Sequence, residues 1–291
     1  MSLQSTYSNV RWAFNFGNWK PLKEHWKLAV QCIQKEERER CYQFCFVEDC
    51  KASLIGRLLM RKAASESCAL PYDKLHFLRT SSGKPFLGDT NINFSFNISH
   101  NGDFCVLAAS KQSMNIGVDV MKIEHRGRRT VEEFFTTMKK QFSSYEWDFI
   151  SQPGFEIEQL GRFYRLWCLK ESYVKAVGTG ISCDLQKISF HCQTPVLQQN
   201  IITIDTKLYL EGIIQPKWRF EETFLDNNHC VAVALEPNNT GSESSDENFD
   251  HSSSCFTILS FEDLMINCKP FENIEQSFWE AFQSKNQKSC S

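Results

Sequence analysis

Hydrophobic and polar residues follow two different periods along this chain of 291 residues. Residues 10–16, VRWAFNF, alternate apolar and polar positions as a half-buried strand does, whereas residues 22–68 have the spacing of helices. The strand-like segment KLHFLRT follows, and residues 94–98 then alternate up to HNGD, whose Asn-Gly pair favours a type I′ hairpin. FCVLAAS is the expected return strand, and NIGVDVM is the next strand. Together these elements predict a meander.

The second half of the chain repeats this order of helices followed by strands. A capping box from Ser143 to Glu146 predicts one helix start, and the apolar spacing predicts a second helix over residues 161–177. Short strands are expected near KISFHC, IITIDTKLYL, KWRFEE and HCVAVAL. This order, found twice, predicts an α+β fold of two similar lobes packed together.

Two features bear on the organisation of the chain. A Gly-Arg pair at residues 56–57 recurs at residues 161–162, and each pair is expected to open a helix that a strand follows; so short a repeat often arises by chance.

Residues 237–254 hold one apolar residue, Phe249, and cannot bury enough surface to offset chain entropy. We therefore expect four segments: an N-terminal lobe over 1–114, a C-terminal lobe over 115–236, a disordered linker over 237–254, and an extension over 255–291 that docks on the body.

The helix predicted around FYRLWCLKESYVKAVGTG has a lysine in the middle of its apolar side. At about 100° per residue, Lys170 lies near the centre of a stripe formed by Phe163, Leu166, Trp167, Tyr173, Val174 and Val177. Glu171 lies at the edge of the stripe, with Lys175 one turn later. An unpaired ammonium is costly in apolar surroundings, so Lys170 must extend to solvent, find a partner or meet an anion. Taken alone, extension to solvent and a surface ion pair between Glu171 and Lys175 are the simplest explanations.

Composition narrows the class of protein. With 42% hydrophobic and 13% aromatic residues, the chain can bury one large core or two ordinary ones. A net charge of −3 and a pI near 6.2 give no overall attraction to nucleic acid or membrane, so an anion site must be a local cluster of Lys and Arg. The 13 cysteines lack a CxxC pair, which fits reduced thiols in the cytosol. The sequence has no signal-peptide pattern and no apolar run of the roughly 20 residues that span a bilayer, so we expect a soluble protein.

Three separated segments carry charge that a plain core does not need. RTSSGKP places Arg79 and Lys84 around a glycine turn, which is typical either of a solvated loop or of a phosphate cradle. FNISHNGD places His100 at a hairpin turn, where it is either structural or, when protonated, a donor to phosphate. GVDVM places Asp119 on a short apolar strand, and strands are depleted in Asp.

Asp119 and Glu171 together would make a pair of hard oxygen ligands suited to Mg²⁺, which binds one or two carboxylates together with substrate phosphates and water. Basic residues around such a pair indicate a phosphate-handling centre better than a glycosidase, whose acid needs an apolar pocket. The sequence has no Walker loop, dinucleotide glycine fingerprint or Gly-x-Ser-x-Gly elbow. The remaining class of reaction is a phosphoryl-type transfer by a protein that lacks a nucleoside-triphosphate-binding fold.

The segments SSGKP, FNISH, IGVDVM and FYRLWCLKESYVKAVGTGI, in this order, resemble the 4′-phosphopantetheinyl transferase superfamily of the two-lobed type. VRWAF, RERCYQF, GRLLMRK and FTILSFEDLMINC are similar to its animal members. The resemblance implies a monomer with two α+β lobes related by a pseudo-twofold axis, coenzyme A in the cleft between them, and Mg²⁺. The implied reaction moves phosphopantetheine from coenzyme A to a serine of an apo carrier domain and releases adenosine 3′,5′-bisphosphate. The implied carriers are those of fatty acid synthase and of the aminoadipate-semialdehyde dehydrogenase type.

The resemblance also implies roles for individual residues. Asp119 and Glu171 match the metal carboxylates, Glu171 also takes the serine proton, and Lys170 and Lys175 face the pyrophosphate. Asp119, Glu171 and Lys175 are thus the implied catalytic residues. The implied contacts to coenzyme A are Arg40, Arg79, Ser82, Gly83, Lys84, Pro85, Asn97, Ile98, Ser99, His100, Asp119, Lys170, Glu171 and Lys175.

One position departs from the pattern of this superfamily. Many relatives have an acid two residues after the aspartate, but this chain has Met121, a poor ligand for a hard cation. Asn101 is the alternative third metal ligand, directly or through water. Met121 keeps open a second hypothesis, a coenzyme A or carrier-binding protein with impaired catalysis. A third is a metal-dependent hydrolase of phosphate esters that needs no carrier.

Overall fold

The computed structural model describes residues 8–81, 83–88, 91–125, 127, 129–178, 183–238, 255–271 and 277–287. Their contacts divide them into two compact units. Unit 1 comprises the described residues of Met1–Gln112 and Thr257–Cys290, and unit 2 those of Ser113–Phe256. The linker was expected over residues 237–254, but Pro237 belongs to a strand that spans His229–Pro237. The rest of the expected linker from residue 239 on lies outside the described residues, as does Ser82.

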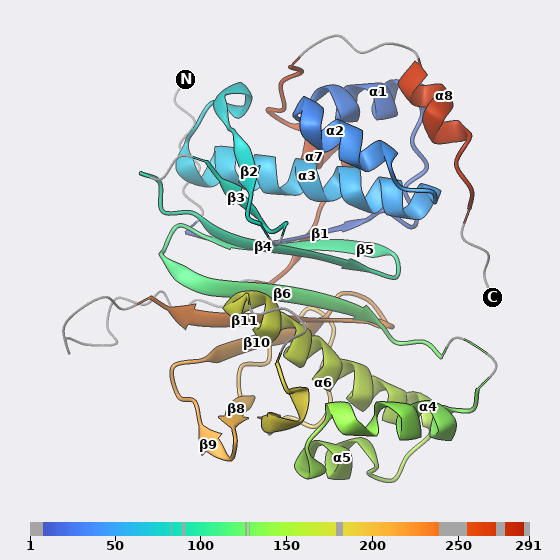
Figure 1. The fold of residues 1–291 in the computed structure, drawn as a ribbon, viewed down its shortest axis with the longest axis vertical. Coiled ribbons are helices and arrows are strands. Elements are labelled where there is room, and N and C mark those ends of the chain that lie inside the picture. Colours follow the sequence, from blue (N-terminus) through green and yellow to red (C-terminus); the bar gives the residue numbers. More distant parts are fainter. Residues whose placement is uncertain are drawn as a thin grey trace. The chain divides into compact units, whose positions relative to one another are not determined.

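Unit 1 packs helices on a mixed four-stranded sheet. Its helices are α1 (Lys23–Gln31), α2 (Lys35–Tyr42), α3 (Val47–Cys68) and the short η1 (Tyr72–Lys74). The sheet has the order β12-β1-β5-β4, formed by β1 (Asn9–Asn15), β4 (Ser95–Asn101), β5 (Phe104–Ser110) and β12 (Thr257–Ile258). A separate hairpin joins β2 (Phe77–Arg79) to β3 (Pro85–Leu87). Figure 1 shows α3 running along the sheet of unit 1.

The C-terminal residues of the chain complete the core of unit 1. β12 pairs with β1 in parallel, and it is followed by α7 (Phe261–Met265) and α8 (Ser277–Gln283). Phe261 stacks on Trp19 with ring centroids 5.2 Å apart, and Phe282 stacks on Trp26 at 3.7 Å. Residues from both ends of the chain therefore build one hydrophobic core.

Unit 2 has one long helix packed on an antiparallel sheet. The sheet has the order β10-β11-β6, formed by β6 (Met114–Lys122), β10 (Arg219–Phe224) and β11 (His229–Pro237). The helix α6 (Glu156–Val177) lies along it (Figure 1). The remaining elements are α4 (Val131–Met138), η2 (Lys139–Gln141), α5 (Ser144–Ile150), η4 (Leu185–Lys187), β7 (Ile188–His191), β8 (Lys207–Leu210) and β9 (Ile213–Ile214).

The architecture confirms the predicted α+β class with two lobes, and α3 and α6 are both 22 residues long. The capping box of α5 is present, since the Ser143 hydroxyl accepts from the Glu146 amide while the Glu146 carboxylate accepts from the Ser143 amide. Each helix also begins before its Gly-Arg pair, so the expectation that these pairs open the helices is wrong. Gly56 and Gly161 lie inside α3 and α6.

Two further expectations are corrected. The predicted meander does not form, because β6 pairs with β11 of unit 2 rather than continuing the sheet of β4 and β5. The hairpin between β4 and β5 is present, but its two central residues are Gly102 and Asp103. A positive φ occurs at Gly102 (57°) and not at Asp103. This pattern fits a type II′ turn, in which only the first central residue needs positive φ, rather than type I′.

The segment IITIDTKLYL contributes less strand than expected. Only Lys207–Leu210 forms a strand, β8, while Thr203 makes an isolated bridge to Glu222. None of the helices in the described ranges is long and apolar enough to cross a bilayer.

Candidate active site

Close packing of α6 on β6 brings the predicted acidic residues together. A Cβ atom on Gly117 of β6 would clash with the carbonyl oxygen of Ser172 and lie 2.5 Å from the amide nitrogen of Ala176, so glycine lets the helix backbone reach the strand. Asp119 points to the same side, because alternate residues of a strand share a face. The Cys168 thiol donates to the carbonyl oxygen of Asp119 at 3.1 Å, which places this part of α6 directly over Asp119.

Asp119, Glu171 and Lys175 form one charged group, which we call the carboxylate cluster. The Lys175 Nζ lies 2.6 Å from Asp119 Oδ1, and the two side chains are 29% and 6% exposed. Glu171 is half-buried and lies one turn before Lys175 on the same side of α6. The cluster is therefore partly open to solvent and lies within unit 2.

The two carboxylates of this cluster lie close enough to influence each other's charge. Burial raises the pKa of Glu171, and the negative charge of Asp119 raises it further, while the ammonium of Lys175 opposes the shift. A carboxylate beside a like charge takes up a proton or a cation more readily than an isolated one. Glu171 is thereby suited both to accept a proton and to bind a positive ion.

The donor set fits a magnesium ion. Within the described ranges, no three His, Cys, Asp or Glu side chains converge on a common point, as a site built entirely from protein ligands would require. Mg²⁺ does not need such a site, because it commonly binds one or two carboxylates and completes its shell with substrate phosphates and water. Asp119 and Glu171 supply that number of carboxylates.

The structure places the two candidates for a third metal ligand in different surroundings. Met121 is the next residue on the Asp119 face of β6, and its side chain packs against the hydrophobic core of unit 2. It therefore serves as packing beside the cluster. Asn101 ends β4 in unit 1, so its role as a ligand to a metal held by unit 2 remains a prediction.

Lys170 does not have the environment that the resemblance implies. Its side chain is 0% exposed, and its Nζ lies 2.9 Å from the equally buried Glu146 Oε2. The same nitrogen donates to the carbonyl oxygens of Leu185, at 2.8 Å, and Ile188. A buried nitrogen with three acceptors does not face a pyrophosphate, so we leave Lys170 out of the proposed contacts to coenzyme A.

In unit 1, the predicted phosphate cradle is the turn between β2 and β3. The Thr80 amide donates to the Lys84 carbonyl oxygen at 2.9 Å, and Gly83 adopts a φ of 86° that favours glycine. Arg79 supports this turn by donating to the Gly83 carbonyl oxygen at 2.7 Å. Its other donors bind both carboxylate oxygens of Glu37, at 2.8 and 2.6 Å. Arg79 is therefore in part a structural residue of the cradle.

The other predicted contacts in unit 1 differ in accessibility. Arg40 on α2 and His100 on β4 are exposed, and Lys84 is half-buried, which lowers its pKa. Ile98 points into the core, because its Cδ1 atom would lie 3.0 Å from a Cβ atom on Gly56 of α3. The remaining described members of the set lie on β3 and β4 or in the cradle turn: Gly83, Pro85, Asn97 and Ser99.

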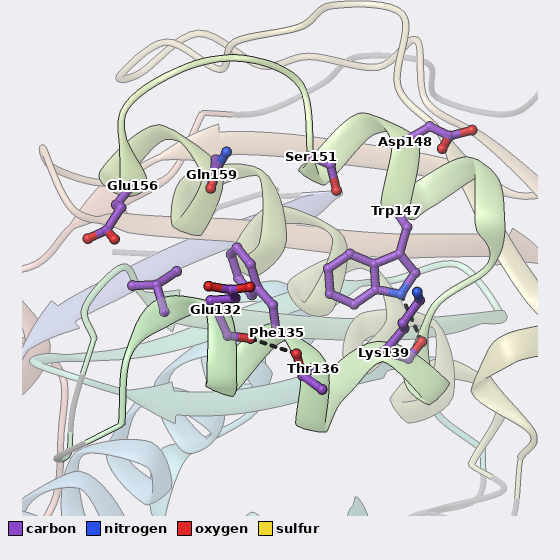
Figure 2. A pocket seen from close by; sticks show the side chains of 10 residues that line it. Glu132, Phe135, Thr136, Lys139, Trp147, Asp148, Ser151, Glu156 and Gln159 are labelled. Atoms are coloured by element: carbon purple, nitrogen blue, oxygen red, sulfur yellow. Dashed lines mark hydrogen bonds between the residues drawn. The ribbon is translucent and has the colours of Figure 1, made fainter.

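A pocket also opens at the other end of α6, away from the carboxylate cluster. It has a volume of about 660 Å³ and is lined by residues of α4, α5 and the first turn of α6, among them Phe135, Trp147 and Glu156 (Figure 2). Asp119, Glu171 and Lys175 are not among its lining residues. This pocket is therefore separate from the carboxylate cluster.

Comparison with known proteins identifies the family to which this chain belongs. Residues 17–112 match the family described as 4′-phosphopantetheinyl transferase, N-terminal, and residues 115–234 match the 4′-phosphopantetheinyl transferase superfamily. The chain belongs to this superfamily and is a phosphopantetheinyl transferase, an enzyme that uses coenzyme A to modify carrier proteins.

The chain is similar over nearly its full length to animal enzymes of this class. It is 40% identical to the L-aminoadipate-semialdehyde dehydrogenase-phosphopantetheinyl transferase of Xenopus laevis over 283 residues, which cover 96% of this chain and 93% of that protein. The protein of the same name from Rattus norvegicus is 41% identical over 280 residues, 94% of this chain and 90% of that protein. A 4′-phosphopantetheinyl transferase of Bacillus subtilis is 34% identical over 171 residues, 58% of this chain and 71% of that protein.

Sequence reasoning missed two buried acids that hold site residues. Glu146 was assigned only as a helix cap, yet it also binds Lys170. Glu37 accepts from Arg79 and also lies 2.6 Å from the Nε of Arg57. The sequence carried a signal for Glu146, because Lys170 needed a partner, but many acids were available. Glu37 lies among other charged residues in KEERERCY and gives no such signal.

Proposed function

We propose that the chain transfers the phosphopantetheine of coenzyme A to a serine of an apo carrier domain in a magnesium-dependent reaction at the carboxylate cluster. The observation that supports this most strongly is the convergence of Asp119 and Glu171 on one face between β6 and α6, with Lys175 beside them. The superfamily supplies the reaction class, and the donor set fits the metal.

In the proposed mechanism, Asp119 and Glu171 would hold a magnesium ion, which would offset the negative charge of the pyrophosphate. Lys175 contacts a phosphate oxygen on which negative charge grows as the carrier serine attacks the β-phosphorus. Glu171 accepts the serine proton, directly or through a water molecule. Adenosine 3′,5′-bisphosphate leaves.

Unit 1 is proposed to bind the nucleotide end of coenzyme A. Lys84 and the backbone of the cradle turn, with His100, supply donors suited to a phosphate, and Arg40 adds charge to the same unit. Arg79 shapes the turn through Gly83 and Glu37. Asn97, Ser99 and Pro85 remain proposed contacts, and Ile98 contributes through its backbone.

The carriers are proposed to be domains of fatty acid synthase and of an aminoadipate-semialdehyde dehydrogenase. The second follows from the names of the similar animal proteins. We propose that the chain acts as a monomer in the cytosol. The twelve described cysteines form no disulfide, which fits the cytosol.

The test is to incubate the protein with coenzyme A, Mg²⁺ and an apo carrier domain and to measure the carrier mass. Addition of phosphopantetheine is expected for the wild type, and Asp119→Asn and Glu171→Gln should lower kcat/KM on the order of 10²–10³. Glu156→Gln, an exposed acid in the first turn of the same helix, is the control and should leave the rate unchanged.

Two other outcomes would replace this proposal. Binding of coenzyme A without carrier modification, unaffected by Glu171→Gln, would favour the impaired binding protein that Met121 kept open. Release of pantetheine phosphate without a carrier would instead favour the phosphate ester hydrolase.

A further inference from the structure

Lys170 and Glu146 are both buried and charged, and the proposed reaction uses neither. Burial lowers the pKa of Lys170 and raises that of Glu146, and their mutual attraction offsets part of both shifts. Each is tied to backbone as well: Glu146 accepts from the amides of Ser143 at 2.8 Å and Phe190 at 3.1 Å. The pair, with these bonds, therefore connects α6 to α5, η4 and β7.

The pair lies on the side of α6 away from β6. At about 100° per residue, Cys168 and Ser172 lie roughly 160° from Lys170 around the helix axis. Those two residues contact β6, through the Asp119 carbonyl oxygen and at Gly117. The Lys170 ammonium faces Phe142, with its nitrogen 5.3 Å from the ring centroid. Contacts on two opposite sides of α6, within about one turn of the helix, therefore hold it in place.

This arrangement fixes the rotation of α6 about its own axis. Glu171 lies about 100° and Lys175 about 140° around the axis from Lys170, so a small rotation of the helix would turn both away from Asp119. The apolar residues of the stripe also resist rotation, because they are close-packed in the core of unit 2, but apolar attraction by itself is not directional. Charged hydrogen bonds from one nitrogen to a carboxylate and two carbonyl oxygens are directional.

We propose that Lys170 is a positioning residue, whose ion pair with Glu146 sets the rotation of α6 and thereby aims Glu171 and Lys175 at Asp119. The proposal rests on the proposed function only for the assignment of the reacting residues. It differs from the role that the resemblance implied for Lys170, which was direct contact with the pyrophosphate, and the two roles predict different kinetics.

The test uses three single variants, Lys170→Met, Lys170→Arg and Glu146→Gln. It compares them with the double variant, which combines Lys170→Met and Glu146→Gln. Lys170→Met should lower kcat at least tenfold while the KM and the dissociation constant for coenzyme A change less than about threefold. Lys170→Arg should not restore kcat, because the slot has no exposed surface to take the larger group. The double variant should be more active and melt higher than Lys170→Met, because it no longer buries an unpaired carboxylate.

Direct contact with coenzyme A predicts the opposite set of results. Lys170→Met would then mainly raise the KM and dissociation constant for coenzyme A, Lys170→Arg would restore most activity, and Glu146→Gln would not rescue Lys170→Met. Any of these overturns the proposal. The matched control is the exposed pair of Lys187 and Glu211, whose side chains are 58% and 65% exposed. Lys187→Met with Glu211→Gln should show neither loss nor coupling.

Two further comparisons apply if Lys170→Met does not fold or if the wild type is inactive. If Lys170→Met does not fold, the double variant is compared with the wild type, and a kcat loss at constant affinity for coenzyme A supports the proposal, whereas a loss of affinity contradicts it. If the wild type transfers no phosphopantetheine, the proposed function fails, but coupling between the two substitutions in thermal melts still tests the ion pair.

Discussion

At the scale of single residues, Gly117 is the position where α6 and β6 come closest. In Gly117→Ala, the added methyl group would meet the backbone at Ser172 and Ala176, which cannot move aside as a flexible side chain can. We expect a loss of about 1–3 kcal/mol in the free energy of unfolding and a fall in kcat, because Asp119 would shift relative to Glu171. Urea denaturation and carrier modification measure the two effects.

Gly161→Ala is the matched control, a Gly→Ala change within α6 itself. The nearest atom to its added Cβ is the Ile123 Cδ1 at 4.0 Å, so the methyl group fits. An alanine in a helix interior should stabilise by up to about 1 kcal/mol. Equal stability changes at the two glycines would contradict the close approach at Gly117.

Glu37 should make unit 1 sensitive to acid. Burial alone would raise its pKa, but hydrogen bonds and charge from Arg79 and Arg57 lower it below the ordinary value of 4.5. A carboxyl whose folded pKa is lowered contributes stability above its unfolded pKa and loses it as the pH falls through the folded pKa. Stability should therefore fall as the pH is lowered from about 4.5.

Glu37→Gln tests this contribution. The variant should be less stable than the wild type at neutral pH, and the difference should shrink as the pH falls below about 4.5. Urea midpoints at several pH values measure it. Glu36→Gln, an exposed neighbour on α2, should behave as the wild type. A difference between Glu37→Gln and the wild type that does not vary with pH would contradict the assignment.

At the scale of elements, two capping boxes in unit 2 differ in what they hold. Thr130 caps α4 by accepting from the Glu133 amide at 3.2 Å, and it is exposed. Ser143 caps α5 and also bonds the Ser189 hydroxyl of β7 at 2.8 Å. Thr130→Ala should cost about 1 kcal/mol. Ser143→Ala should cost roughly 0.5–1.5 kcal/mol more, because a second hydrogen bond is lost. Chemical denaturation of both variants checks the order; equal costs would show that the bond to β7 adds nothing.

Local patterns predicted elements well and their partners poorly. The stripe around Lys170 and the box at Ser143 identified α6 and α5 because both signals lie within a few residues of chain. The pairing of β6 with β11 joins strands that lie far apart in the sequence, and nothing in NIGVDVM distinguishes it from a strand beside β5. The turn type at Gly102 depended on register, which the Asn-Gly pair alone does not set.

The candidate site shows the same difference between what local sequence predicts and what depends on tertiary packing. Asp119 and Glu171 were predicted as metal ligands from their residue types and from resemblance, and that role remains a proposal. The structure brings the two residues together through the close approach at Gly117. For Lys170, the sequence posed the right question, which was what partner a lysine in an apolar stripe has. The answer required Glu146, whose position beside α6 follows from how α5 packs.

At the scale of the whole molecule, unit 1 is built from two segments that lie far apart in the sequence. Unit 1 takes its first strands and helices from the start of the chain and β12, α7 and α8 from the end. Its core and that of unit 2 are separate clusters of buried residues. A substitution in the C-terminal segment should therefore destabilise the N-terminal elements of unit 1 more than the elements of unit 2, although the latter lie nearer in the sequence.

Leu264→Ala tests that expectation. Leu264 of α7 is 0% exposed and belongs to the core of unit 1, so its truncation should cost about 2–5 kcal/mol. Hydrogen exchange should accelerate at the amides of β1 and β5 while those of β10 and β11 keep their protection, because the latter surround a different core. Ile266→Ala, two residues later and 54% exposed, is the control and should change neither. Equal acceleration in both sheets would mean that the units unfold as one, so that the C-terminal segment stabilises the carboxylate cluster as well as the core it fills.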